Sequence, residues 1–251
     1  MQMRILLIRH AEPDYNIDNL TAKGRVEAEL LARRLSRLPV KDVYVSPLGR
    51  AQATAEVYLK RTGKTAETLP WLKEFKGTIP DPDTGAPRIA WDLKPRIWTA
   101  MAGYEDAAHW QEMPCLQGGT LKQMWRETTD GIDALMARYG FRKDGPVWNC
   151  VDNRDITIAL FCHFGIAMAV TGYLTETSPM ILWHRTLMLP SSVTELVTEE
   201  RIHGEAAFRM IRMGDLTHLE ANGEVASTAG LYPMLYNGID STDPGRNGCT
   251  F

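Results

Sequence analysis

The sequence predicts an α/β protein, a three-layer α/β/α sandwich in which helices cover both faces of one mostly parallel central sheet. Short stretches rich in aliphatic and β-branched residues alternate along the chain with longer segments of helical periodicity. Two late β-like stretches, residues 191–200 and 206–215, are joined by a turn at His203-Gly204 and predict an antiparallel hairpin at an edge of the sheet. The length of 251 residues suits one such domain, residues 1–251.

The first part of the chain supplies two strand–helix pairs. Residues 3–8 form an apolar run that predicts a buried strand, and residues 20–38 predict a helix with Thr21 as its cap. Residues 41–47 predict a second strand and residues 49–63 a second helix. The apolar residues at helical spacing predict the buried face of the first helix: Val26, Leu30, Leu31, Leu35 and Leu38.

The later elements follow the same alternation. Residues 67–75 predict an extended segment, and residues 119–140 predict a third helix. The segment 156–175 contains no Asp, Glu, Lys or Arg and is nominally long enough to span a bilayer. His163 at its middle and Gly165 after it favour instead a buried strand, a turn and a buried helix. We therefore expect no membrane contact.

Residues 76–119 interrupt the alternation. This stretch contains five prolines together with several tryptophan and tyrosine rings. Its length and composition are typical of a lid or binding element. We expect it to form a lid, because its start adjoins the candidate site residue Glu74. A subdomain that only extends the core is the alternative.

Composition excludes several classes of function. A net charge of -3 without a long basic run argues against nucleic acid as a partner. The four cysteines lie far apart with no CxxC pair, which suits neither a zinc site nor a disulfide scaffold and favours a reducing compartment. The N-terminal apolar run is too short for a signal peptide, so we expect a cytoplasmic protein.

Polar side chains follow three of the predicted strands at the point where each strand ends. Arg9 and His10 follow the first strand, Ser46 and Arg50 follow the second, and His163 follows the strand that starts at residue 156. The carboxyl ends of parallel strands meet at one edge of a sheet, where ligands bind. Guanidinium forks bind phosphate oxygens in pairs, and backbone N–H groups at a helix start add donors. The cluster therefore predicts a site for a phosphoryl group.

Other phosphate chemistries lack their residues. The GxxxxGK[ST] pattern of P-loop enzymes is absent, and no cysteine is followed by arginine after five residues, as a cysteine phosphatase requires. No spacing of carboxylates and histidines fits a two-metal centre, so we expect no metal and no cofactor. A nucleophilic histidine remains.

The ordered motifs IRHAEPDYN, LTAKGRVEA, VSPLGRAQATA, LPWLKEF and FCHFG resemble the histidine phosphatase superfamily, the phosphoglycerate-mutase-like fold, over residues 4–165. The resemblance implies that His10 becomes phosphorylated and that Glu74 is the proton donor. It also implies a phosphate-binding role for the other matching positions. The residues that bind phosphate or substrate are then Arg9, Asn16, Arg50, His163, Phe164 and Gly165.

The function expected is hydrolysis of a small phosphomonoester. Neutral His10 attacks phosphorus, while Arg9, Arg50 and protonated His163 neutralise the phosphoryl oxygens. A 2,3-bisphosphoglycerate-dependent phosphoglycerate mutase is the alternative, disfavoured because Pro13-Asp14 replaces the Ser/Thr-bearing sequence of such mutases. A catalytically idle module that binds phosphorylated ligands is a third hypothesis. The natural substrate, the oligomeric state and the order of residues 237–251 are not predicted.

Overall fold

The structure, a computed structural model, describes residues 3–151 and 155–230 of the chain. The segment 237–251, about whose order the sequence makes no prediction, and Cys249 lie outside the described residues.

The core of the described chain is an eight-stranded sheet in the order β5-β4-β10-β1-β11-β12-β9-β8. Its four parallel strands are β5, β4, β10 and β1, and the antiparallel pairs begin where β1 meets β11. The bounds are β1 Met3–Arg9, β4 Val40–Val45, β5 Glu67–Thr68, β8 Phe141–Asp144, β9 Val147–Cys150, β10 Ile156–Cys162, β11 Val193–Ile202 and β12 Glu205–Asp215.

The predicted α/β class is confirmed, and the sheet is mixed rather than mostly parallel. The predicted late hairpin forms as β11 and β12, with its turn between Ile202 and Glu205. It does not end the sheet, because β12 pairs with β9, and β9 pairs with β8 in a second hairpin. That second hairpin lies between the third helix and β10, in residues that sequence periodicity does not assign to strands.

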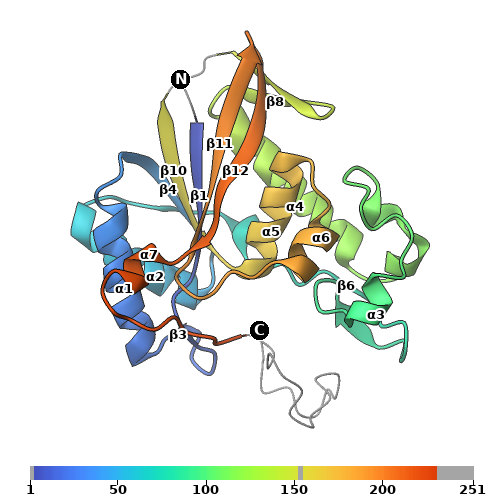
Figure 1. The fold of residues 1–251 in the computed structure, drawn as a ribbon, viewed down its shortest axis with the longest axis horizontal. Helices are drawn as coiled ribbons and strands as arrows, with labels where there is room; N and C mark the ends of the chain where they lie inside the picture. Colours follow the sequence, from blue (N-terminus) through green and yellow to red (C-terminus); the bar gives the residue numbers. More distant parts are fainter. Residues whose placement is uncertain (1–2, 152–154, 231–251) are drawn as a thin grey trace.

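Helices cover both faces of the sheet (Figure 1). On one face α1 and α2 pack on the cluster that contains Leu6 and Ile8 of β1. On the other face α4 and α5 share the larger cluster with Ile5 and Leu7, so alternate residues of one strand serve the two layers. The bounds are α1 Ala22–Leu35, α2 Gly49–Thr62, α4 Leu121–Ala137, α5 Phe164–Thr175, α6 Pro179–Arg185 and α7 Thr217–Glu220.

Helix α1 begins as predicted, and of its predicted buried face Leu31 and Leu35 are buried whereas Val26 is exposed. The Thr21 side chain caps it by accepting from the N–H of Gly24. Val26 is 46% exposed, whereas Ala28 and Leu31 are buried. The small side chains on this face allow α1 to approach α2 closely, and Val26 therefore points to solvent.

The segment 156–175 forms strand β10 and helix α5, as predicted, and both are buried in the sandwich. Within the described residues, no helix combines the length and apolar character needed to cross a membrane. Three short elements carry the loops around the strand ends. They are β2 Pro13–Asp14, β3 Asn19–Leu20 and the 3-10 turn Pro70–Leu72.

The insertion of residues 76–119 is mainly irregular and packs on the α4, α5 and α6 side of the sandwich (Figure 1). Trp98 and Trp110 are buried in the larger core cluster, and the Trp110 ring meets Trp183 of α6 edge-on. The short elements of the insertion are β6 Thr78–Pro80, β7 Pro87–Ile89, α3 Pro95–Trp98 and the 3-10 turns Trp110–Glu112 and Pro114–Leu116.

Candidate active site

The predicted strand ends meet because β4, β10 and β1 are neighbours in the sheet. The backbone N–H of His10 donates to the carbonyl of Cys162 at 3.0 Å, and that of Ser46 donates to the carbonyl of Phe161 at 2.9 Å. His163 follows Cys162 directly. The ring centroids of His10 and His163 lie 5.2 Å apart. Parallel pairing thus brings three separate segments of the sequence to one point.

The tautomer of His10 is fixed by its neighbour in the chain. Its Nδ1 lies 2.8 Å from the carbonyl oxygen of Ala11, an atom that only accepts, so Nδ1 carries the proton and donates. The other ring nitrogen, Nε2, then keeps its lone pair. Burial lowers the pKa of His10 well below its ordinary value, and the charges of Arg9 and Arg50 lower it further. His10 is therefore a neutral imidazole whose Nε2 lone pair is available.

Arg9 and Arg50 are both buried beside this ring, at 4% and 6% exposure. The guanidinium of Arg9 donates to the carbonyl of Met188, and that of Arg50 donates to Asp18 at 2.6 Å. In the described part of the chain, the Nε atoms of both arginines are buried and meet no hydrogen-bond partner. Leaving buried donors unpaired costs free energy, so these two atoms indicate a binding site for an anionic ligand.

His163 is fully buried and held through Ser46. Its Nε2 lies 2.7 Å from the Ser46 hydroxyl, while its buried Nδ1 has no partner among the described residues. Burial, His10 and the two arginines lower the pKa of His163 well below its ordinary value. Burial and these neighbours disfavour the cation in the protein without a ligand, and the expected protonated imidazole stays a prediction.

Glu74 reaches the site from the extended segment after the 3-10 turn. It is 7% exposed, and its Oε1 accepts from the backbone N–H groups of Phe75 at 2.8 Å and Ile166 at 3.1 Å. Burial raises the pKa of Glu74, although these hydrogen bonds and the two arginines oppose the rise. Because Oε1 accepts two hydrogen bonds, Oε2 is the oxygen left to carry a proton.

The first turn of α5 is shaped for close approach to Glu74. A Cβ on Gly165 would lie 2.8 Å from Oε1 of Glu74 and 2.6 Å from Nε1 of Trp91. Only glycine fits there. The neighbouring Phe164 is partly buried and meets the Trp91 ring edge-on, with centroids 5.9 Å apart. Trp91 belongs to the insertion, and its indole N–H donates to the carbonyl of Phe75, the residue after the predicted acid.

Asn16 is the one predicted residue that the fold does not bring into this cluster. It is exposed, and its backbone N–H donates to the Asp14 side chain at 3.0 Å. Two neighbours that the motif does not indicate lie closer: Tyr15, whose ring is 5.4 Å from the guanidinium carbon of Arg50, and Asp18, the partner of Arg50. The positions of Tyr15 and Asp18 depend on the conformation of the loop, and that conformation cannot be predicted from residue types alone.

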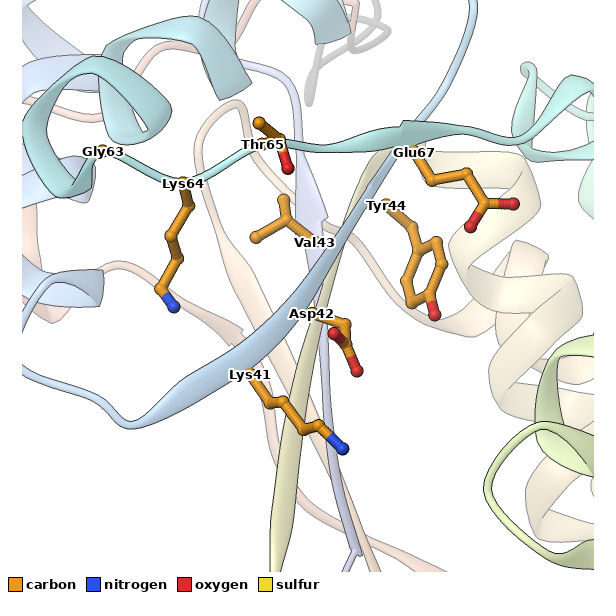
Figure 2. A pocket seen from close by; sticks show the side chains of 8 residues that line it. All are labelled: Lys41, Asp42, Val43, Tyr44, Gly63, Lys64, Thr65 and Glu67. Atoms are coloured by element: carbon orange, nitrogen blue, oxygen red, sulfur yellow. The ribbon is translucent and has the colours of Figure 1, made fainter.

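A separate cleft of about 360 Å³ runs along β4 and the end of α2 (Figure 2). It is lined by Lys41 and Lys64 together with Asp42 and Glu67, and by no predicted site residue. Its charges balance, which gives no preference for an anion. No cluster of three or more His, Cys, Asp or Glu suited to a metal ion occurs within residues 3–151 and 155–230.

This arrangement of a neutral histidine between two buried guanidiniums on an α/β sandwich defines a class. The chain belongs to the histidine phosphatase superfamily (branch 1), whose family model matches residues 5–208.

Curated relatives match parts of the chain. The mitochondrial serine/threonine-protein phosphatase Pgam5 of Caenorhabditis elegans is 34% identical over 109 residues, 41% of this chain and 37% of that protein. The probable phosphoglycerate mutase GpmB of Serratia proteamaculans is 31% identical over 82 residues, 29% of this chain and 38% of that protein. The chain thus matches well under half the length of either relative.

Solved structures match far more of the chain. A mycobacterial glucosyl-3-phosphoglycerate phosphatase has 22% identity and a TM-score of 0.58, covering 85% of this chain and 99% of that one. The phosphoserine phosphatase of Entamoeba histolytica, in complex with 3-phosphoglyceric acid, has 18% identity and a TM-score of 0.55, covering 86% and 99%. At these identities the likeness establishes the fold.

Proposed function

We propose that this protein is a metal-independent phosphatase that hydrolyses a small phosphomonoester through a phosphohistidine on His10. The observation that carries the proposal is the unprotonated Nε2 of His10 beside two buried guanidiniums that retain unpaired donors. Such a site attracts a phosphate dianion and presents a nucleophile to it.

In the first step, Nε2 of His10 attacks phosphorus in line with the ester oxygen. The N–P bond forms as the P–O bond to the alcohol breaks. Arg9, Arg50 and the Nδ1–H of His163 donate to the phosphoryl oxygens, where charge is spread in the transition state. Ser46 acts as a positioning residue here, since its hydroxyl lies 2.7 Å from Nε2 of His163 and leaves Nδ1 as the nitrogen that can face the phosphoryl group.

Glu74 moves the protons of both steps. Its raised pKa favours the protonated carboxyl, which gives its proton from Oε2 to the departing alkoxide. The resulting carboxylate then takes a proton from water, and the water oxygen attacks phosphorus. The N–P bond breaks, orthophosphate leaves, and the lone pair returns to His10.

Three further proposals concern the surroundings of the site. Residues 76–119 act as the lid that selects the alcohol portion of the substrate, supported by the contact of Trp91 with Phe164. The whole chain 1–251 works as one domain around this site. Cys115 and Cys162 are free thiols, which supports a reducing compartment such as the cytoplasm.

A screen of purified protein against small phosphomonoesters, in buffer without added metal, tests the proposal. We expect orthophosphate release from at least one ester. The same preparation is offered 3-phosphoglycerate with 2,3-bisphosphoglycerate as primer. Interconversion of phosphoglycerates that exceeds phosphate release and needs the primer would replace the phosphatase with the mutase. Binding of phosphate without any turnover would favour the idle module.

A further inference from the structure

A second cleft, of about 310 Å³, lies between the end of α1, strand β12 and helix α7. Four arginines line it: Arg33 and Arg34 from the last turn of α1, Arg37 two residues beyond the end of that helix, and Arg212 from β12. Thr217 and His218 of α7 complete its wall. Figure 1 shows α7 beside α1, on the face of the sheet opposite α5.

The positive charge of this cleft is only partly neutralised. Asp215 pairs with Arg34 at 2.7 Å and with Arg212 at 3.2 Å, and Glu195, which also pairs with Arg4, lies 3.9 Å from Arg212. Arg33 and Arg37 are exposed and form no ion pair with any described residue. Two guanidinium charges at the cleft therefore have no carboxylate of their own, in contrast to the balanced lysines of Figure 2.

The dipole of helix α1 explains the presence of some of these arginines but not of all four. Basic side chains in the last turn of a helix are favoured by its dipole, which accounts for Arg33 and Arg34. Arg212 comes from the opposite wall, on a strand, where that argument does not apply. Convergence of guanidiniums from two elements on one hollow is the arrangement that recognises a phosphate.

We propose that this cleft binds a phosphate dianion, as free orthophosphate or as the head of a phosphomonoester. The two uncompensated charges of Arg33 and Arg37 match the charge of one such dianion. The volume of the cleft leaves room for an organic portion beside the phosphate.

The cleft is separate from the candidate active site, but hydrogen bonds connect its wall to His10 of that site. His218 is buried between them, with its Nδ1 3.4 Å from Arg34 and its Nε2 3.1 Å from the hydroxyl of Ser191. Ser191 in turn donates its backbone N–H to the carbonyl of His10 at 2.9 Å. The proposal does not depend on the reaction at His10, because it concerns binding alone.

The test is a titration of the ¹⁵N-labelled full-length chain, followed by backbone amide resonances. Orthophosphate is added to the wild type, and glycerol 2-phosphate is added to His10→Ala so that turnover does not consume it. Sodium chloride at equal ionic strength controls for salt. We expect the amides of Thr217, Ala221 and Asn222 to shift and saturate.

The double variant R33Q/R37Q is expected to weaken this binding by about tenfold or more, because it removes two charge-assisted contacts. The double variant R126Q/R142Q makes the same change of charge at two exposed arginines without ion pairs in the described chain, and is expected to bind as the wild type does. The order of affinity for the two probes identifies free phosphate or an ester as the better ligand.

Amide shifts at the cleft that match those in chloride would overturn the proposal. Equal affinity of R33Q/R37Q and the wild type would do the same. Shifts near His10 are read separately in the same spectra, so failure of this cleft is distinguishable from failure of the proposed phosphatase site. The dispersion of the amide spectrum shows directly whether each variant is folded.

Discussion

The carboxyl group of Glu74 is buried, and its Oε2 is the oxygen left after Oε1 accepts two hydrogen bonds. These two features support its proposed role as the proton donor. Oε1 is fixed by the N–H groups of Phe75 and Ile166, so the carboxyl group has one orientation and one oxygen for the proton. A proton donor matters most when the leaving alkoxide is strongly basic. The contribution of Glu74 is therefore visible in the dependence of the rate on the leaving group.

We predict that Glu74→Gln slows hydrolysis of alkyl phosphates by about 10²-fold or more while slowing 4-nitrophenyl phosphate far less. The measurement is kcat/KM over a series of esters whose alcohols differ in pKa. Glu67→Gln is the control, since Glu67 is exposed in the same extended segment and pairs only with the exposed Arg138. Equal losses on alkyl and aryl esters would give Glu74 a packing role instead.

The pH dependence follows from the same carboxyl group. Burial raises the pKa of Glu74 above its ordinary value of 4.5, so its proton is retained to higher pH than on an exposed glutamate. Activity on alkyl phosphates is present below that raised pKa and falls as pH rises through it. We expect Glu74→Gln to lack this falling limb in a profile of log kcat/KM against pH. A falling limb that persists in the variant would assign it to another group.

Residue type and order were enough to predict five residues that the fold brings close to one another, and their roles in a reaction stay predictions. Arg9, His10, Arg50, Glu74 and His163 all lie buried together. Asn16 was expected with them and is exposed, because the position of its side chain depends on the loop rather than on the motif. In that loop the backbone of Asp18 takes a positive φ of 47°, and its side chain accepts from the N–H of Gly49. Such long-range contacts are not visible in local sequence.

At the scale of elements, the start of α5 connects the sheet to the acid. His163 is the residue before the helix, and the next two residues approach Trp91 and Glu74. Strand β10, which lies between β4 and β1, thereby places His163 beside the proposed nucleophile His10.

We predict that Gly165→Ala lowers activity on alkyl phosphates by about 10²-fold, because small displacements of a catalytic group are costly. The new Cβ would approach both Oε1 of Glu74 and Nε1 of Trp91 to less than 3 Å, so one of them must move. The loss is expected to be smaller on aryl esters, as for Glu74→Gln. Thermal unfolding measures the accompanying change in stability. Unchanged activity in a folded variant would contradict this account of the helix start.

Strong periodicity made the existence of the main elements predictable, but not which face each would bury. The strand, turn and helix of residues 156–175 were predicted because His163 and Gly165 interrupt the uncharged segment. In α1, contact with α2 selected the face with Ala28 and left Val26 exposed. The hairpin of β8 and β9 escaped prediction, because its short strands alternate charged and apolar residues over only four positions each.

At the scale of the whole molecule, the protein supplies positive charge through side chains held in two layers. Arg9 comes from the sheet and Arg50 from α2, and both are buried at the same site. Charge that other phosphatases take from metal ions is here available from guanidiniums. A requirement for metal is therefore not expected.

We predict that exhaustive dialysis against EDTA leaves kcat and KM unchanged, because guanidiniums supply the positive charge that a metal ion would otherwise provide. Steady-state kinetics before and after dialysis, with and without added Mg²⁺, provide the measurement. Loss of activity that returns with a divalent cation would mean that the cluster of arginines is insufficient and that the proposed mechanism lacks a component.

The central claim is that phosphorus becomes bonded to Nε2 of His10 during turnover. Acid-labile phosphohistidine is trapped by rapid quenching under alkaline conditions and located by mass spectrometry of peptides. The account predicts a phosphoryl group on His10 in the wild type, and none in His10→Ala, which also loses turnover. Phosphate release without a label on His10, or substantial turnover by His10→Ala, would contradict it.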